Sequence, residues 1–291
     1  MSRTAIRLVL FDAFDTLITP RLPIHVQYAQ EAHKHGLPES SITPASVRAA
    51  FKPAFRKTTE RFPQWGRHAQ PKPMSPSEWW MVCIEETMRL AGAEQGKLDQ
   101  VMPRLGKALL DRFESAEGYR AFADVIPCCE SANGRYGDPY EAHELAYKRP
   151  VTYLQQAGVK TGLVSNADDR ILKTLGALGI TPLLTHGTTI SQVAGYEKPD
   201  PRIFQTACRS AGIERCEEGV LMVGDEVEAD YHGALRAGLE ARLIRRPGEF
   251  SDGAKRRSED EEREMLHRDG VCVIRSLEEV VDEVRERNRQ S

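Results

Sequence analysis

Two aspartates, a serine and a lysine stand where a phosphate-handling site would need them. Asp12 ends the apolar run of "LVLFDAFDTLIT", Asp225 ends "VLMVGD", and Ser165 ends "GLVS". Lys198, in "GYEKPDP", leads into a helical pattern through a proline turn. Carboxylates bind hard cations such as Mg²⁺, while an ammonium and a hydroxyl can neutralise and hydrogen-bond phosphoryl oxygens. These residue types predict chemistry on a phosphate group held beside a metal ion.

For these side chains to meet, the apolar runs before them must be strands of one sheet. Such runs, rich in Val, Leu and Ile, alternate with helical patterns and cover residues 8–11, 161–164, 220–223, 241–244 and 271–274, with 183–185 as a weaker candidate. Continuous apolar runs are typical of parallel strands buried on both faces, and the carboxyl ends of such strands converge on one crevice. The predicted fold class is therefore α/β, with a Rossmann-like, doubly wound parallel sheet.

Two helix starts in the second half of the chain support this layout. Asp200 and Pro201 form an N-cap and first-position pair, and Ser276 with Glu279 forms a capping box ahead of an apolar stripe. Both signals predict helices that follow the expected strands.

Between residues 19 and 118 the pattern changes to long amphipathic segments without a convincing strand. Residues 44–62, 75–91 and 98–117 are each predicted to be helical. Trp79 and Trp80 open the middle segment, where tryptophans at helical spacing usually pack in a core or between domains. The predicted domains are an α/β core of residues 1–18 and 119–291, and an all-helical insertion of residues 19–118.

Composition narrows the classes of partner. The 291 residues include 40 basic and 43 acidic side chains, which give a net charge of -3 and no broad basic field for nucleic acid. No apolar run reaches the roughly 18 residues that a membrane span needs, and no secretory signal follows the first residues. We expect a cytoplasmic protein whose partner is a small phosphorylated molecule; the oligomeric state is left open.

The order of the motifs carries more weight than any one of them. "FDAFDTL", "LVSN", "GYEKPDPRIF" and "MVGDEVEADYHGALRAG" resemble the four motifs of the haloacid dehalogenase (HAD) superfamily. The resemblance runs from Arg7 to about Val284 and includes a helical cap between the first and second motifs. "SPSEWWMVCIEETMRLAG" and "LIRRPGEFSDG" are further similar to the branch of haloacid dehalogenase-like hydrolase domain-containing proteins.

The resemblance implies a nucleophile and a metal site. Asp12 would attack phosphorus and form an aspartyl-phosphate, which splits one difficult hydrolysis into two displacements. Mg²⁺ would be held by the carboxylates of Asp12 and Asp225 and by the backbone carbonyl of Phe14. Asp230 would orient that set of ligands from five residues further along the chain.

The resemblance also implies the groups that hold the phosphoryl group. Ser165 and Lys198 would bind it and act in catalysis, Asn166 follows in the same motif, and Thr16 matches the small hydroxyl residue of the first motif. Together with the metal site, these residues predict a hydrolase that acts on phosphoric ester or anhydride bonds.

Phe14 departs from the family's pattern. HAD phosphatases usually carry an aspartate at this position, which protonates the leaving group and then activates water, and a phenyl ring can do neither. Dehalogenases also lack that aspartate, so a 2-haloacid dehalogenase that uses Asp12 without metal is one alternative. The acidic "GDEVEAD" favours phosphoryl chemistry, because further carboxylates beside Asp12 would mainly repel it if no metal were bound.

Two other possibilities stay open. Asp15 occupies a place where the family often has glycine, and it either carries the missing proton or hydrogen-bonds within the turn, which we prefer. The second possibility is a weakly catalytic HAD-like scaffold that binds a ligand. Without a proton carrier, hydrolysis should be fast only for substrates with good leaving groups, such as diphosphates or acyl and aryl phosphates.

Overall fold

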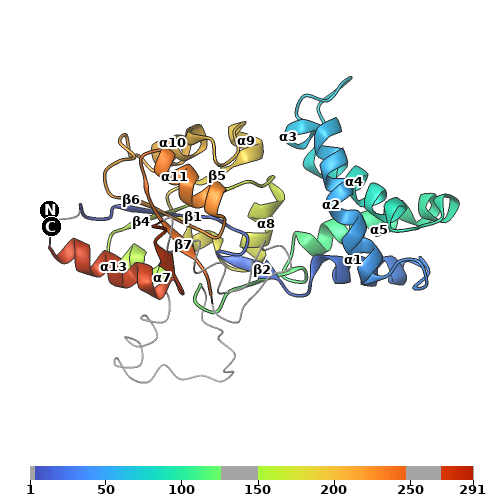
Figure 1. The fold of residues 1–291 in the computed structure, drawn as a ribbon, viewed down its shortest axis with the longest axis horizontal. Coiled ribbons are helices and arrows are strands. Elements are labelled where there is room, and N and C mark those ends of the chain that lie inside the picture. The colour runs from blue at the N-terminus through green and yellow to red at the C-terminus, as the bar shows by residue number, and fades with distance from the viewer. Residues whose placement is uncertain (1–3, 126–149, 247–269, 291) are drawn as a thin grey trace. The chain divides into compact units, whose positions relative to one another are not determined.

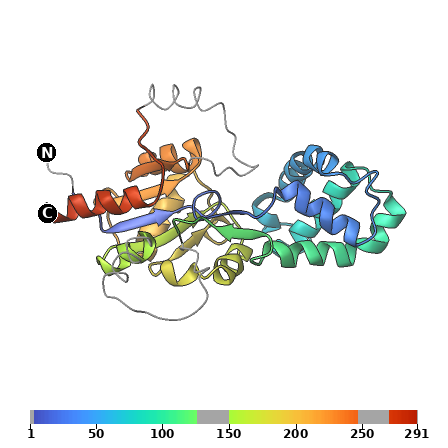
Figure 2. The same cartoon turned by 90° about the horizontal axis from the view of Figure 1, so that it is seen from below.

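The structure is a computed structural model that describes residues 4–125, 150–246 and 270–290 of the chain. The chain folds into two compact units. The core unit consists of Met1–Thr19, Ala121–Asn166 and Gly179–Ser291, and the helical unit of Pro20–Arg120 and Ala167–Leu178. Figures 1 and 2 show both units, which are described separately below.

The core unit contains a six-stranded sheet in which every neighbouring pair of strands is parallel. Its order is β5-β4-β1-β6-β7-β8, with bounds β1 Leu8–Phe11, β4 Lys160–Ser165, β5 Thr188–Ile190, β6 Val220–Gly224, β7 Glu240–Ile244 and β8 Val273–Ile274. All four residues of β1 are buried, as expected of a strand covered on both faces. The chain turns to one side of β1 for β4 and to the other for β6, and ligand sites of α/β sheets lie at such a switch point.

The register of the central strands places their carboxyl ends level. Phe11, the last residue of β1, lies opposite Leu163 of β4 and Val223 of β6. The residues that follow these strands therefore emerge side by side. This arrangement confirms the predicted fold class.

Helices cover both faces of this sheet (Figure 1). On one face lie α9 (Ser191–Ala194), α10 (Pro201–Ser210) and α11 (Gly233–Arg236), and on the other lie α7 (Pro150–Gln156) and α13 (Glu278–Arg289). The helix α10 begins as predicted, because the Asp200 side chain accepts a hydrogen bond from the Arg202 N–H, and Pro201 occupies the first turn. Its apolar face packs into a buried cluster that includes Leu10, Met222 and Phe204.

Two local predictions in the core unit were wrong. Residues 183–185 do not form a strand, because Pro182 sets a 3₁₀ turn, η1 (Thr181–Leu183), and the edge strand β5 comes only afterwards. The capping box of Ser276 and Glu279 does not form either. The N-cap of α13 is Leu277, and the Glu279 carboxylate instead accepts from the Arg275 N–H, one residue before the expected cap.

The helical unit contains six helices among the described residues: α1 Ile24–Lys34, α2 Pro44–Arg61, α3 Pro63–Gly66, α4 Pro76–Leu90, α5 Gln95–Phe113 and α8 Arg170–Ala177. The predicted helices at 44–62 and 75–91 are confirmed to within one residue at each end, whereas α5 begins three residues earlier and ends four earlier than predicted. Capping boxes start two of them, through Thr43 with Ser46 and Ser75 with Glu78.

A short two-stranded sheet, β2 (Ile18–Pro20) and β3 (Tyr119–Ala121), lies where the chain leaves and re-enters the core unit. No strand was predicted there.

The interior of the helical unit is aromatic. Trp79 is 1% exposed, and its ring lies edge-on to Phe55, Trp65 and Trp80, with centroid distances of 5.4, 4.9 and 5.1 Å. The Trp79 indole N–H donates to the Phe62 carbonyl at 2.9 Å, so its only polar atom is paired. The expected packing role of this tryptophan is confirmed.

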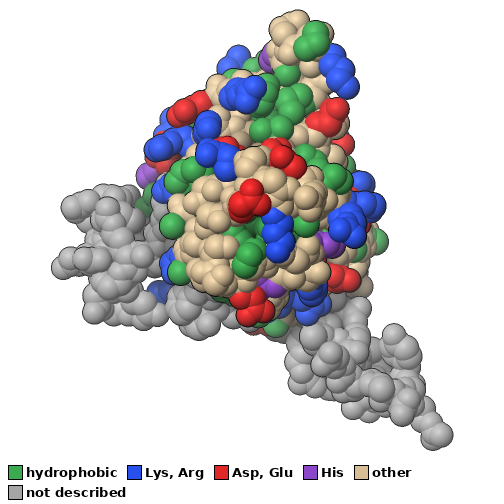
Figure 3. Space-filling view, turned by 90° about the vertical axis from the view of Figure 1, so that its right-hand side faces the viewer, with side chains coloured by type: hydrophobic (Ala, Val, Ile, Leu, Met, Phe, Trp, Pro, Cys, Tyr) green, Lys and Arg blue, Asp and Glu red, His purple; other side chains and the backbone are tan. Residues whose placement is uncertain are grey.

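None of the described helices combines the length and the apolar character that crossing a membrane requires. On the face of the molecule drawn in Figure 3, acidic and basic side chains are interspersed with apolar ones. This pattern agrees with the near balance of charges in the sequence.

Candidate active site

Asp12 is the first residue after the central strand and is held in a closely bonded loop. Its N–H donates to the Val223 carbonyl at 2.9 Å, and its side chain is buried. The loop closes on itself because the amides of Leu17 and Ile18 both donate to the Ala13 carbonyl, at 2.8 and 2.9 Å. The carboxylate is therefore fixed at the carboxyl edge of the sheet by backbone contacts on both sides.

Asp15 lies in the same loop with a left-handed backbone, at a φ of 52°. Its carboxylate accepts a hydrogen bond from the Thr19 hydroxyl at 3.1 Å, and its N–H donates to the Ile18 carbonyl at 2.7 Å. Aspartate tolerates this conformation better than most residues. These contacts favour the turn-forming role of Asp15 over that of a proton carrier. Phe14 lies beside it and forms an isolated β-bridge with Ile18.

Lys198 forms ion pairs with both Asp12 and Asp230. Its ammonium lies 2.6 Å from an oxygen of Asp12 and 2.6 Å from an oxygen of Asp230, and the side chain is almost fully buried. Asn166 holds the backbone of Lys198, since its amide nitrogen donates to the Lys198 carbonyl at 2.9 Å and its amide oxygen accepts the Lys198 N–H at 2.7 Å. Both polar atoms of Asn166 are thus used in placing the lysine, which favours a positioning role over direct contact with phosphate.

Asp225 and Asp230 come from the loop and the short π-helical turn η2 (Val227–His232) that follow β6. One oxygen of Asp230 pairs with Lys198, and the other accepts the Glu226 N–H at 2.9 Å. Gly224 makes this approach possible, because a Cβ built on it would lie 2.2 Å from the Asp230 carboxyl carbon. The sequence carries a signal for this close approach, because Gly224 is the last residue of the strand, directly before Asp225.

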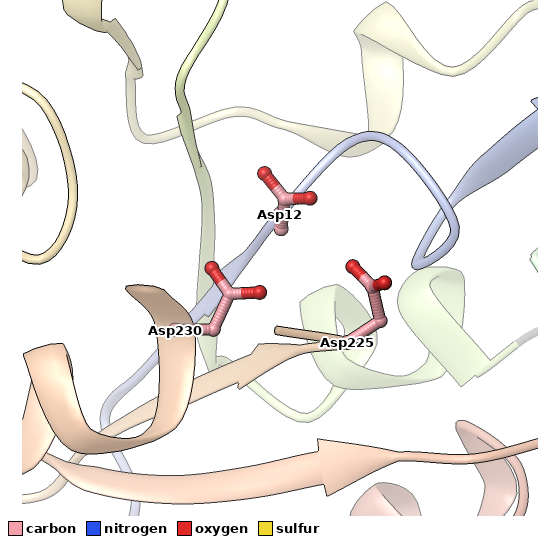
Figure 4. Close-up of side chains that lie close together, drawn as sticks. All are labelled: Asp12, Asp225 and Asp230. Carbon is pink, nitrogen blue, oxygen red and sulfur yellow. The ribbon is translucent and has the colours of Figure 1, made fainter. Parts of the chain in front are cut away.

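Figure 4 shows the carboxylates of Asp12, Asp225 and Asp230 facing a common space. One oxygen from each lies within 4.8 Å of the others. Three hard oxygen donors this close suit a small divalent cation such as Mg²⁺, which takes oxygen ligands at about 2.0–2.1 Å. The donor set therefore fits the ion that the sequence predicts.

The electrostatics of the cluster point the same way. Burial raises the pKa of Asp12 to about 6, with a further increase from Asp230, against the lowering effect of Lys198. Burial, followed by the charges of Asp12 and Asp230, raises the pKa of Asp225 well above its ordinary value. For Lys198, burial by itself would lower the pKa, but the two adjacent carboxylates raise it overall, which keeps the ammonium charged. The cluster is thus crowded with negative charge that one lysine offsets only in part.

Two of the predicted site residues carry buried hydroxyls without a partner among the described residues. Ser165 and Thr16 are 1% and 0% exposed, and neither hydroxyl oxygen has a hydrogen-bond partner among the described residues. A buried hydroxyl without a partner costs stability, so its presence needs an explanation such as a ligand. Ser165 is the last residue of β4, next to β1, as predicted.

Comparison with known proteins identifies the family. Residues 6–238 match the family model for haloacid dehalogenase-like hydrolases. The chain belongs to this family. Haloacid dehalogenase-like hydrolase domain-containing protein 3 of Mus musculus is 30% identical over 242 residues, which cover 83% of each chain. The resemblance stated from the motifs, including the branch, is confirmed.

Solved structures agree on the fold and differ in activity. A HAD phosphatase from Thermococcus onnurineus is 19% identical, with a TM-score of 0.52 and coverage of 96% of this chain and 98% of that one. A defluorinating L-2-haloacid dehalogenase is 15% identical, with a TM-score of 0.63 and coverage of 97% and 98%. At these identities the likeness shows the fold alone. Membership of the family makes the chain a hydrolase of the HAD type, and the reaction must be argued from the site.

Proposed function

We propose that this chain is a Mg²⁺-dependent phosphatase that hydrolyses a small organic phosphate or diphosphate through an aspartyl-phosphate on Asp12. The observation that carries the proposal is the cluster of Asp12, Asp225 and Asp230, whose oxygens lie within 4.8 Å of one another. A carbon–halogen bond gains little from such a cluster, whereas phosphoryl transfer needs its charge neutralised by a cation. A cytoplasmic location stays a prediction from the sequence.

In the first step, an Asp12 carboxylate oxygen attacks phosphorus. The new P–O bond forms as the bond to the leaving oxygen breaks, and that oxygen departs with the electron pair and then takes a proton. In the second step, water attacks the same phosphorus, the bond to Asp12 breaks, and the carboxylate is restored while inorganic phosphate leaves. Lys198, which contacts Asp12 in the resting site, neutralises phosphoryl charge in both steps.

The remaining residues bind the phosphoryl group or orient Lys198. The Ser165 hydroxyl donates to a phosphoryl oxygen, which satisfies a buried group that otherwise has no partner among the described residues. Thr16 supplies a further donor from the nucleophile loop. Asn166 keeps Lys198 in place, and Asp230 anchors the Lys198 ammonium from the opposite side.

Asp12, Asp225 and the backbone carbonyl of Phe14 would hold the metal ion, with Asp230 orienting them. When bound, Mg²⁺ supplies Lewis-acid neutralisation of the phosphoryl oxygens and relieves the crowding of the carboxylates.

Phe14 shapes the choice of substrate. Neither Phe14 nor Asp15, whose carboxylate is bonded to Thr19, provides a free proton carrier in the nucleophile loop. We therefore propose substrates whose leaving group needs little protonation, such as diphosphates and aryl or acyl phosphates.

A 2-haloacid dehalogenase is the second candidate. The phenyl ring at Phe14 favours it, because halide leaves without a proton. The crowded carboxylates oppose it, since two further carboxylates within 4.8 Å of Asp12 repel its charge when no cation is bound. A ligand-binding scaffold with weak turnover is the third candidate.

The test is a substrate panel of mono- and diphosphates and 2-haloacids, each assayed with Mg²⁺ and with EDTA. We expect release of phosphate that depends on Mg²⁺. Halide release that is unaffected by EDTA would replace the proposal with the dehalogenase, and no turnover of any substrate would favour the scaffold. In parallel, Mg²⁺ should raise the melting temperature of the wild-type protein but not that of Asp225→Asn, because binding to the native state alone stabilises it.

A further inference from the structure

Two consecutive arginines at the end of β7, Arg245 and Arg246, bind the backbones of the two loops that carry the proposed site. Arg245 donates from its guanidinium to the carbonyl of Asp225. Arg246 donates to the carbonyl of Thr16 at 2.9 Å, in the loop that follows Asp12. Neither arginine is assigned a part in the proposed chemistry. One dipeptide thus contacts both the proposed metal-ligand loop and the nucleophile loop.

The topology explains how neighbours in sequence reach different loops. β7 pairs with β6, and β6 pairs with β1, so the end of β7 lies next to Asp225 and two strands away from the nucleophile loop. Arg245 is fixed by its own N–H, which donates to the Ile274 carbonyl at 2.9 Å, and its side chain reaches the adjacent loop. Arg246 spans the longer distance, from the end of β7 to the Thr16 carbonyl in the nucleophile loop.

Arg246 is placed from several directions. Its Nε lies 3.0 and 2.9 Å from the two oxygens of Asp124, and its guanidinium carbon is 4.1 Å from the centre of the Phe122 ring. Asp124 in turn accepts the Leu277 N–H at 2.9 Å, which ties it to the start of α13. The planar fork of arginine can serve Asp124 and Thr16 at once, and a lysine ammonium on a flexible stem would not match that geometry.

Stability alone does not account for this residue. Arg246 is 8% exposed, and its Nη1 has no hydrogen-bond partner among the described residues. A buried guanidinium with an unused donor is a costly way to join two segments, and an apolar pair of similar volume would often be as stable. Retention of the charge is therefore better explained by the carbonyl that it holds.

We infer that Arg245 and Arg246 form a brace that fixes the nucleophile loop relative to the proposed metal-ligand loop, and so sets the spacing of Asp12 and Asp225. The expected effect of the brace on Mg²⁺ binding rests on the proposed function, whereas the hydrogen bonds that form the brace do not. Both arginines are positioning residues, since each acts through a backbone carbonyl. Positioning groups around metal ligands typically change metal affinity or activity by about 10- to 100-fold when they are removed.

Hydrogen exchange measured by mass spectrometry tests the brace without any need for activity. The amides of Leu17 and Ile18 report on the nucleophile loop, and those of Asp230 and Tyr231, which donate to the Glu226 carbonyl, report on the other loop. In Arg246→Met, exchange should rise at least about 10-fold in residues 13–18 and much less in 226–231. In Arg245→Met the order should be reversed.

Arg242 provides a matched control on the same strand. It is 9% exposed and paired with Glu283 of α13, so Arg242→Met also breaks a buried ion pair. The hydrogen bonds of its guanidinium go to Glu283 and to the Ala241 carbonyl, and not to a carbonyl of either loop. Arg242→Met should lower the melting temperature and leave exchange in both loops, and the Mg²⁺ affinity, as in the wild type. Arg246→Met leaves Asp124 without its ion-pair partner. Arg246→Lys is therefore the second variant, because it keeps the buried positive charge and loses only the forked guanidinium.

The affinity for Mg²⁺, measured by calorimetry, gives the second readout. Arg245→Met and Arg246→Met should each bind Mg²⁺ about 10- to 100-fold more weakly than the wild type. Exchange that rises equally in both loops for Arg245→Met, Arg246→Met and Arg242→Met would overturn the brace. Exchange that rises in neither loop for Arg246→Met and Arg246→Lys would also overturn it. If the wild type binds no Mg²⁺ and releases no phosphate, the proposed function fails, and the loop-specific exchange still decides whether the brace exists.

Discussion

The proposed site in the core unit and the aromatic cluster around Trp79 in the helical unit bury opposite kinds of side chain. In the core unit, Asp12, Lys198 and Asp230 are all nearly inaccessible and in direct contact. In the helical unit, the buried cluster consists of the aromatic rings around Trp79, and the single polar atom of Trp79 is paired. Burying rings stabilises a fold, whereas burying charges costs free energy unless something else requires them. The contrast separates a unit built for packing from one that carries a site.

Several polar groups of the helical unit are paired within one or two helical turns. Its two capping boxes use side chains three residues apart, and the hydroxyl of Thr87 donates to the Cys83 carbonyl at 2.7 Å, one turn away. The core unit instead leaves the hydroxyls of Ser165 and Thr16 without partners among the described residues. The helical unit has one such atom too, the indole nitrogen of Trp65, so the contrast lies in the two hydroxyls, which belong to residues proposed to bind phosphate.

Asp12→Asn should reduce turnover by roughly 10⁴-fold or more, because the amide is not a nucleophile and no other group replaces it. The fold should survive, since the two side chains are nearly the same size and Lys198 keeps its pair with Asp230. Steady-state kinetics and thermal unfolding measure the two effects. Activity within a few-fold of the wild type would exclude Asp12 as the nucleophile.

Trp79→Ala should have the converse effect, with a loss of about 3–5 kcal/mol in the free energy of unfolding, as for other large aromatic truncations in a core. The Mg²⁺ affinity of the folded protein should change little. Denaturant unfolding and calorimetry measure these quantities, and Trp79→Phe, which keeps a ring, is the control. If the alanine variant lost metal affinity as strongly as Asp225→Asn, the division between the units would be wrong.

Phe14→Asp should add the group that the nucleophile loop lacks. General acid catalysis typically contributes roughly 10²- to 10⁴-fold, and a carboxylate at an unoptimised position should reach the lower end of that range for alkyl phosphates. Aryl phosphates, whose leaving groups need less protonation, should gain much less. The quantity to measure is the ratio of kcat/KM for the two classes. A ratio that is unchanged in Phe14→Asp but collapses in Asp15→Asn would identify Asp15 as the proton carrier.

Glu86 in α4 should give the smallest effect and a pH dependence of known sign. Hydrogen bonds from Arg89 lower its pKa to about 2, against the opposing effect of burial, and Lys57 lowers it further. Because the pKa is lower in the folded state, this stabilisation is present above the unfolded value near 4.5 and is lost as the pH falls toward 2. Glu86→Gln should therefore lower the free energy of unfolding by less than about 1 kcal/mol at pH 7. The difference between the two proteins should vanish at acid pH in thermal unfolding.

The sequence predicted the central sheet well because strands buried on both faces must be continuously apolar, as residues 8–11 and 220–223 are. It missed β5, an edge strand of only three residues, two of them threonines, whose position depends on the turn at Pro182. Short edge strands are set by their neighbours in the sheet and leave little pattern of their own.

The same limit applied to the site. That Asp12, Ser165 and Asp225 would emerge at one edge of the sheet followed from their places at the ends of parallel strands, and Lys198 was expected to reach them from the proline turn before a helix. Two contacts could not be predicted. Both polar atoms of the Asn166 side chain hydrogen-bond to the backbone of Lys198. Arg246 hydrogen-bonds to the carbonyl of Thr16, which is 230 residues away in the chain. Both depend on long-range contacts that no local pattern encodes.

Mass spectrometry of one peptide can show whether Asp12 forms an aspartyl-phosphate during turnover. Trypsin releases Leu8–Arg21, which contains Asp12, from a reaction run in ¹⁸O-labelled water and stopped with acid during turnover. Because water should attack phosphorus and not the carboxyl carbon, we predict that part of this peptide carries a phosphoryl group at Asp12, that the rest carries no ¹⁸O, and that the released phosphate is labelled. A peptide that carries ¹⁸O at Asp12 and no phosphoryl group would contradict the account, because it would show that an ester of Asp12 had been hydrolysed at carbon, as dehalogenation requires.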